Sequence, residues 1–157
     1  MTSLEVRRSL PHPADRVWRA FTDPAALAAW FWPQRFDPVV SVDLRVGGSY
    51  RIDGPGAGMA VSGVYREVTP PSRLVFTWQW DNETETTLVT VTIVPSATGT
   101  ELMIRHERFE DDVVRDAHEQ GWSDCLDRLP EWLARDPHPA CTRSCHERQL
   151  TRSTVDG

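Results

Sequence analysis

Two histidines occupy positions in the sequence where chemistry could take place inside the protein. His106 alternates with Leu102 and Ile104 on the apolar side of a predicted strand, and His118 lies near the middle of the apolar stripe of a predicted helix. An imidazole could act as a general base near neutral pH, or it could orient a ligand by hydrogen bonding. A buried imidazole needs a hydrogen-bond partner in any case, so each could equally be a satisfied core histidine.

Aromatic side chains are predicted to surround the two histidines. Two tryptophans share the apolar face of one strand, a third follows the second histidine by one helical turn, and two tyrosines alternate into the sheet interior, where they could add hydroxyl donors. The candidate ligand-binding residues are Trp78, Trp80, His106, His118, Trp122, Tyr65 and Tyr50. Tryptophans at this spacing are also typical of a packed core, and a register slip of one residue would turn strand side chains outward.

No familiar catalytic motif is present in the sequence. It contains no Gly-x-Ser-x-Gly elbow, no His-Glu-x-x-His and no Cys-x-x-Cys pair. Cys125 lies in an apolar helical stripe, where a thiol should be inert. All 17 basic residues are arginine, which excludes lysine imine chemistry. We therefore expect no cofactor, and if the protein is an enzyme the candidate catalytic residues are His106 and His118.

The last part of the chain differs in composition from the rest. Residues 136–157 are rich in Pro, Thr, Ser, Arg and Gln without periodicity, which predicts a disordered tail after a domain that spans residues 1–135. The tail contains four zinc-capable side chains, namely His138, Cys141, Cys145 and His146. Their spacing matches no standard zinc motif, so we predict an unstructured tail rather than a metal site.

A strand and a long helix are the elements that must position the candidate residues. Residues 73–80 alternate strictly, with large apolar side chains on one face and a second face that tolerates water. Residues 112–135 carry apolar side chains at i, i+3 and i+4 spacing, which predicts an amphipathic helix. We expect the apolar stripe of this helix to cover the apolar face of the sheet.

The remaining segments predict an antiparallel meander preceded by two short helices. We expect strands over 4–10, 39–44, 49–52, 59–68 and 100–107, a further strand with Val89, Val91 and Ile93 on its inner face, and helices over 13–22 and 24–29. Asp23 before Pro24 indicates the start of the second helix. The glycine-rich loop at 54–58 opens no helix, so it predicts a hairpin turn rather than a phosphate site. The aromatic cluster at 30–32 could be a hydrophobic plug or the lip of a pocket.

Composition and charge exclude several classes of function. The chain has 157 residues and a net charge of −6, which argues against binding to nucleic-acid phosphates. No apolar run approaches the roughly 20 residues needed to span a membrane, and the start lacks a signal-peptide core. Three cysteines are too few for a disulfide framework. We expect a cytoplasmic domain with reduced thiols, and a monomer or a homodimer.

Seven short stretches, in order along the first 135 residues, together resemble a known family. They are Pro13-Ala-Asp-Arg-Val-Trp-Arg-Ala-Phe-Thr-Asp-Pro24, Trp30-Phe31, Gly47-Gly-Ser-Tyr50, Gly63-Val-Tyr-Arg-Glu-Val68, Arg73-Leu-Val-Phe-Thr-Trp78, Thr100-Glu-Leu102 and Gln120-Gly-Trp122. The chain resembles the activator of heat-shock protein 90 ATPase homologue-like domain, within the superfamily of START-like and Bet v 1-like folds. The resemblance implies an α+β helix-grip fold, in which a curved antiparallel sheet wraps a long C-terminal helix, with two short helices after the first strand.

The resemblance also implies a cavity between the sheet and the last helix. Our leading hypothesis is that this cavity binds a small hydrophobic or aromatic ligand. A first alternative is a co-chaperone-like regulator that acts in the stress response on a chaperone ATPase or another protein partner. A second alternative is a polyketide cyclase-like enzyme that uses a pocket histidine.

Overall fold

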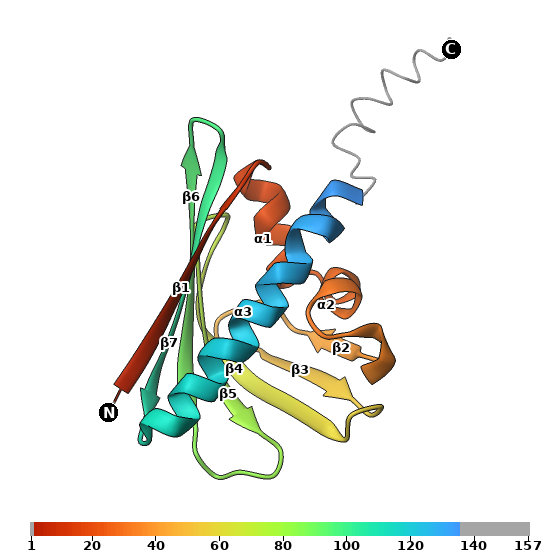
Figure 1. Ribbon diagram of the computed structural model, residues 1–157, viewed down its shortest axis with the longest axis vertical. Coiled ribbons are helices and arrows are strands. Elements are labelled where there is room, and N and C mark those ends of the chain that lie inside the picture. Colours follow the sequence, from red (N-terminus) through yellow and green to blue (C-terminus); the bar gives the residue numbers. More distant parts are fainter. Residues whose placement is uncertain (1, 136–157) are drawn as a thin grey trace.

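The computed structural model describes residues 2–135, which form an antiparallel sheet of seven strands with three α-helices on one of its faces (Figure 1). The strand order is β1-β7-β6-β5-β4-β3-β2. The elements are β1 (Thr2–Leu10), α1 (Ala14–Thr22), α2 (Pro24–Trp30), a 3-10 turn (Gln34–Phe36), β2 (Val39–Val42), β3 (Ser49–Gly54), β4 (Met59–Thr69), β5 (Arg73–Trp80), β6 (Thr87–Ser96), β7 (Gly99–Phe109) and α3 (Asp112–Arg135). This arrangement confirms the predicted helix-grip fold.

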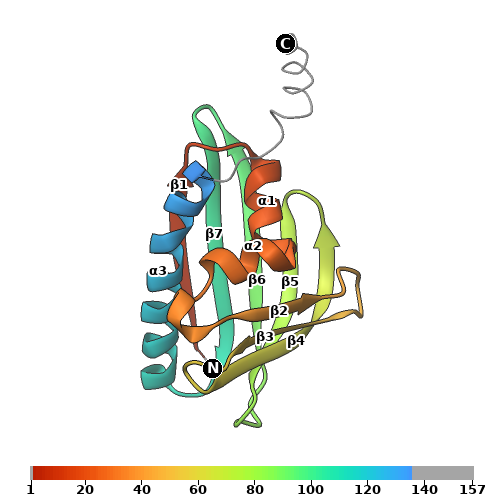
Figure 2. The same ribbon diagram turned by 90° about the vertical axis from the view of Figure 1, so that its right-hand side faces the viewer.

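The long helix α3 lies along the β1 and β7 side of the sheet, and α1 and α2 cover the concave face beside it (Figure 2). The apolar stripe of α3 is buried over its C-terminal half, whereas Ala117 and Gly121, which the periodicity also places in the stripe, are exposed. The buried side chains of α3 are Trp122, Cys125, Leu126, Leu129 and Leu133. They join the inward residues of the sheet in one hydrophobic core, and burial of such side chains is the main favourable contribution to folding.

The sheet curves strongly, so that β2 and β3 run across the direction of β6 and β7 (Figure 2). The bend lies in β4, where the pairing with β5 shifts register between Tyr65 and Glu67. Gly63, near this shift, has no side chain, and a Cβ there would collide with the carbonyl oxygen of Thr77. The ring of Tyr50 therefore passes beside Gly63 and donates a hydrogen bond of 2.6 Å from its hydroxyl to that carbonyl. This contact ties β3 to β5 across β4.

The two short helices begin and pack as their sequence predicts. Asp23 caps α2, because its carboxylate accepts a hydrogen bond of 3.1 Å from the backbone N–H of Ala26, with Pro24 at the first helical position. The indole of Trp30 donates a 2.8 Å hydrogen bond to the carbonyl of Ala20 in α1. Trp30, the last residue of α2, is thus anchored in the core.

The second face of β5 differs from the expectation. We predicted that the residues alternating with its large apolar side chains would tolerate water, but Val75 and Thr77 are buried. The hydroxyl of Thr77 accepts a 2.8 Å hydrogen bond from the backbone N–H of Val64. Since β5 is the central strand of the seven, it has a neighbour on each side, and a polar side chain there can be satisfied within the sheet.

The predicted tail at 136–157, with its four zinc-capable side chains, lies outside the described residues. Within residues 2–135, none of the helices is long and apolar enough to cross a membrane.

Candidate functional site

A cleft of about 610 Å³ opens between α3, the end of β5 and the segment that follows α2. This volume falls within the range of roughly 300–1,000 Å³ that is typical of small-molecule sites. Aromatic rings form much of the wall, and its polar side chains are His118, Arg35, Asp124, Asp127 and Arg128. The rings that line it include Phe31, Trp32, Trp78, Trp80, His118 and Trp122.

Two nearly parallel indoles form one side of the cleft. The rings of Trp32 and Trp80 are inclined by only 6° and their centroids are 6.1 Å apart. The indole of Trp32 packs closely against Gly54 at the end of β3. A Cβ at position 54 would lie only 3.0 Å from two carbons of the indole. The glycine-rich loop is a hairpin turn between β3 and β4, as predicted, and it also supports this wall of the cleft.

Trp80 is fixed from the helix side by His118. The indole N–H of Trp80 donates a 2.9 Å hydrogen bond to Nε2 of His118, and Nδ1 of the same imidazole lies 2.8 Å from the carbonyl oxygen of Val114. An indole nitrogen is only a donor, so Nε2 must accept and Nδ1–H must donate to the carbonyl. Both nitrogens of this half-buried imidazole are therefore occupied, and its tautomer is set by its neighbours.

His106 makes a similar arrangement deeper in the core. Trp122 donates a 3.0 Å hydrogen bond to Nδ1, Nε2–H lies 2.7 Å from the hydroxyl of Thr87, and Thr87 in turn donates to the carbonyl of Trp78 at 3.2 Å. The side chain is fully buried, and burial, with a smaller contribution from His118, lowers the pKa of His106 to about 2. His106 is thus a neutral core histidine at physiological pH.

The structure brings four of the seven candidate residues to the cleft. Trp78, Trp80, His118 and Trp122 line it, whereas His106 lies behind Trp122 and does not. The two tyrosines line a separate small void of about 20 Å³, and Phe31, Trp78 and Trp122 line both this void and the cleft. Burial raises the pKa of Tyr50 and of Tyr65, so both hydroxyls stay protonated.

The bulge at the end of β7 explains why a phenyl ring also reaches the histidines. Arg108 has a positive φ of 78°, so Phe109 turns inward although strict alternation from His106 would turn it outward. The ring centroid of Phe109 lies 4.5 Å from that of His106 and 4.9 Å from that of His118. Phe109 therefore packs against both imidazoles.

The predicted candidates did not include several other residues of the cleft, among them Gly121, Arg35 and Arg128. Gly121 lies on the exposed side of α3 and lines the cleft, and a Cβ there would meet no atom within 4 Å. Arg35 and Arg128 bring positive charge to the same space. Helical spacing puts Gly121 in the apolar stripe of the predicted helix, whereas no local pattern assigned Arg35 or Arg128 to a site.

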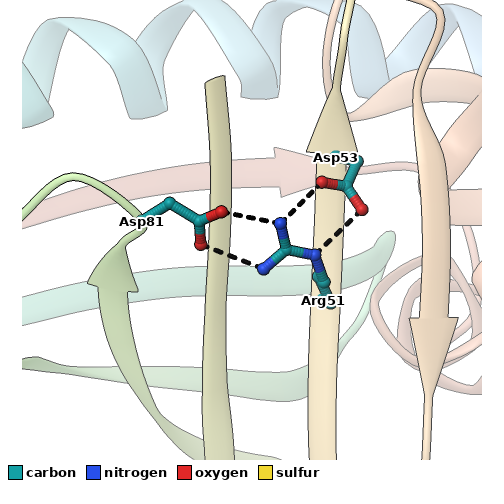
Figure 3. A network of polar contacts seen from close by, with 3 residues as sticks. All are labelled: Arg51, Asp53 and Asp81. Atoms are coloured by element: carbon teal, nitrogen blue, oxygen red, sulfur yellow. Dashed lines mark hydrogen bonds and ion pairs between the residues drawn. The ribbon is translucent and has the colours of Figure 1, made fainter. Parts of the chain in front are cut away.

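An ion-pair network on the opposite face holds the strand end that carries Trp80 (Figure 3). Arg51 on β3 binds Asp81 through two hydrogen bonds of 2.9 and 2.7 Å, and Asp53 through two of 2.9 Å. The hydrogen bonds from Arg51 lower the pKa of Asp81. Because Asp81 directly follows Trp80, this bidentate bridge fixes the end of β5 from outside.

Neither a reactive thiol nor a metal site appears in the described part of the chain. Burial raises the pKa of Cys125 to about 12, as expected for an inert thiol in an apolar stripe. Among residues 2–135, no group of three or more His, Cys, Asp or Glu side chains could hold a metal ion.

Comparison with known proteins places this geometry among related structures. Residues 11–134 match the family model described as Activator of Hsp90 ATPase homolog 1-like protein. Protein CV1439 from Chromobacterium violaceum is 31% identical, with a TM-score of 0.74 over 85% of this chain and 99% of that one. DynU16, from the dynemicin biosynthetic locus, is 28% identical, with a TM-score of 0.75. The match covers 85% of this chain and 47% of DynU16.

A third solved structure is that of an activator of HSP90. It is PFC0360w, an HSP90 activator from Plasmodium falciparum, with 24% identity and a TM-score of 0.69 over 84% of this chain and 96% of that one. At this identity the likeness concerns the fold alone. No curated protein matches the chain.

Proposed function

The chain belongs to the Activator of Hsp90 ATPase homolog 1-like family, and from this premise we propose that it binds a small hydrophobic or aromatic molecule in the cleft between the sheet and α3. The observation that carries the proposal is the open cleft of about 610 Å³ with aromatic walls. The proposed ligand-contacting residues are Trp32, Trp78, Trp80, His118 and Trp122. A planar ligand would gain both burial of apolar area and contact with aromatic faces.

Preorganisation of the walls supports binding. Trp80 is held by His118 on one side, and its strand end is held by the Arg51–Asp81 bridge on the other. Trp32 is packed against Gly54. A site whose side chains are already ordered loses less conformational entropy when a ligand enters.

The occupied imidazoles favour binding over proton transfer. A cyclase-like mechanism needs a nitrogen that can accept a proton from the substrate. The lone pair of His118 already accepts from the indole of Trp80, and that of His106 accepts from Trp122 in the core. The co-chaperone alternative would be favoured by an exposed aromatic patch around residues 30–32, but Trp30, Phe31 and Trp32 are only 1%, 3% and 5% exposed.

The test uses N-phenyl-1-naphthylamine, an uncharged aromatic probe that fluoresces more strongly in apolar surroundings. We expect saturable binding to the protein, and a loss of affinity of about tenfold or more in Gly121→Leu, whose isobutyl group would occupy the cleft. Gly121→Ala is the matched control. It adds a methyl group in open space, so it should leave most of the binding intact.

The same pair of variants separates blocking from unfolding. Alanine in a helix interior is more favourable than glycine by about 0.5–1 kcal/mol, so Gly121→Ala should raise the melting temperature. If the probe fails to bind the protein, or binds Gly121→Leu as tightly as the native chain, the cleft is not the ligand site.

A further inference from the structure

We propose that the ligand carries an anionic group, a carboxylate or a sulfonate, which Arg128 binds at the α2 end of the cleft. This inference rests on the proposed function, because it specifies the class of molecule that the same cleft takes. Three observations support this inference. The guanidinium of Arg128 is held in one orientation, no carboxylate of the described chain forms an ion pair with it, and a second arginine lines the same cleft.

Arg128 is held in one orientation by the end of α2. Its Nε donates to the carbonyl of Trp30 at 3.2 Å, and its Nη2 donates to the carbonyl of Phe31 at 2.7 Å and lies 3.7 Å from the sulfur of Cys125. These are the carbonyls at the C-terminus of a helix, where a cation is favourable. Capping of the helix explains why Arg128 is ordered, but it uses only Nε and Nη2 of the guanidinium.

The remaining nitrogen of the guanidinium is available. Nη1 of Arg128 has no hydrogen-bond partner within residues 2–135. This atom is accessible to solvent rather than buried. The side chain is half-buried and lines the cleft. A guanidinium carries five donors. Two donors on Nη1 are therefore oriented and unused beside an apolar site.

No carboxylate in the described part of the chain neutralises Arg128. Asp127, the next residue back, pairs with Arg8 at 3.3 Å. Asp124, one turn earlier on α3, accepts a 3.0 Å hydrogen bond from the amide of Gln120 and makes no ion pair with Arg128. The positive charge of Arg128 is thus left for an external partner.

Arg35 adds a second positive charge to the same cleft. Its guanidinium lies 5.2 Å from the ring centroid of Phe36, and among the ion pairs of residues 2–135 none includes it. Asp124 also lines the cleft and pairs with no cation in that part of the chain. Its negative charge therefore reduces the attraction of Arg35 and Arg128 for an anion. Two arginines beside aromatic walls match a molecule with an aromatic body and an anionic end.

The test compares two probes that share an aromatic skeleton and differ by one anionic group. 8-Anilinonaphthalene-1-sulfonate has the aromatic skeleton of N-phenyl-1-naphthylamine plus a sulfonate. We expect the sulfonate probe to bind the full chain more tightly, with an affinity that falls as salt is added. We expect Arg128→Gln to weaken its binding by about tenfold or more and to change binding of the uncharged probe by less than about twofold.

Further variants keep the test independent of the helix cap. Arg35→Gln removes the exposed charge and should weaken the sulfonate probe alone, whereas Asp124→Asn should strengthen it. Arg7→Gln, an exposed β1 residue that does not line the cleft, has the same change in net charge and should change neither probe. Circular dichroism melts show whether Arg128→Gln folds; if it does not, the other two variants decide.

The outcomes separate this inference from the proposed function. If neither probe binds the native chain, the proposed function fails. If the uncharged probe binds and both probes respond equally to Arg128→Gln, Arg35→Gln and Asp124→Asn, the cleft binds aromatics but the anion-binding inference is overturned.

Discussion

The buried, neutral state of His106 predicts a loss of stability when the pH falls from 7 to 5. In the folded protein the pKa of His106 is about 2, whereas the imidazole of an unfolded chain has a pKa near 6.5. Below 6.5 the unfolded chain therefore binds a proton that the folded protein does not, which favours unfolding. The contribution of His106 is complete above pH 6.5 and is lost progressively as the pH falls toward the folded pKa.

The size of the effect follows from these two pKa values. Each pH unit below the unfolded pKa lowers the free energy of unfolding by about 1.4 kcal/mol per proton. Between pH 7 and pH 5 the histidine should therefore remove about 2 kcal/mol. The result at pH 5 hardly changes if the folded pKa is one unit higher, because the imidazole is still neutral there.

The assay is urea denaturation at pH 7, 6 and 5 for the native chain and for His106→Leu. The variant will be less stable at pH 7, since Trp122 and Thr87 lose their partner. Its stability should fall less with pH, so the gap between the two proteins should narrow by about 2 kcal/mol at pH 5. Other titrating groups are common to both proteins, so their effects cancel in the comparison.

A second readout reports the imidazole directly. The Cε1 proton of His106 should keep one chemical shift from pH 8 to pH 5 in the folded protein. A titration of that resonance near pH 6.5, or parallel pH slopes for the two proteins, would show that the assigned hydrogen bonds and burial of His106 are not those of the native state.

Two further predictions follow from buried polar groups. Tyr50→Phe removes the hydroxyl that donates to Thr77 and should lower the free energy of unfolding in urea by about 1 kcal/mol. Tyr65→Phe, whose hydroxyl makes no hydrogen bond in the described part of the structure, should lower it less, and equal losses would contradict the role of the Tyr50 hydrogen bond. Burial raises the pKa of Cys125 to about 12, so this thiol should resist iodoacetamide at pH 8 until urea unfolds the chain. Mass spectrometry checks this, and rapid alkylation of Cys125 in the folded protein would count against its burial.

Local patterns were sufficient to predict most of the secondary structure. The strand at 73–80 and the helix at 112–135 have the bounds that their periodicity predicts, because each has one continuous apolar face. The cap at Asp23 was predictable, since a carboxylate before a proline favours a helix start. Boundaries were less accurate where strands extend beyond their patterned part, as in β3, which continues to Gly54.

Part of the candidate site was predictable for the same reason. Alternation and helical spacing brought Trp78, Trp80, His118 and Trp122 to one interior, and the structure places all four at the cleft. The same patterns could not divide that interior into a cleft, a packed core and a small void. Tyr50 and Tyr65 also point inward, but they line the void, whereas Phe31, Trp78 and Trp122 line both the void and the cleft.

The amino-acid sequence alone indicated the helix-grip fold through its family resemblance. Short-range periodicity and residue type determined the inward faces of β5 and α3 and the absence of familiar catalytic motifs. Only the tertiary structure decided what the inward and polar residues do. The acceptor nitrogens of both histidines are occupied by indoles that lie 16 or 38 residues away along the chain. Arg128 reaches the end of a helix almost 100 residues earlier. Contacts at such separations depend on how the curved sheet and α3 pack together, and local sequence does not encode them.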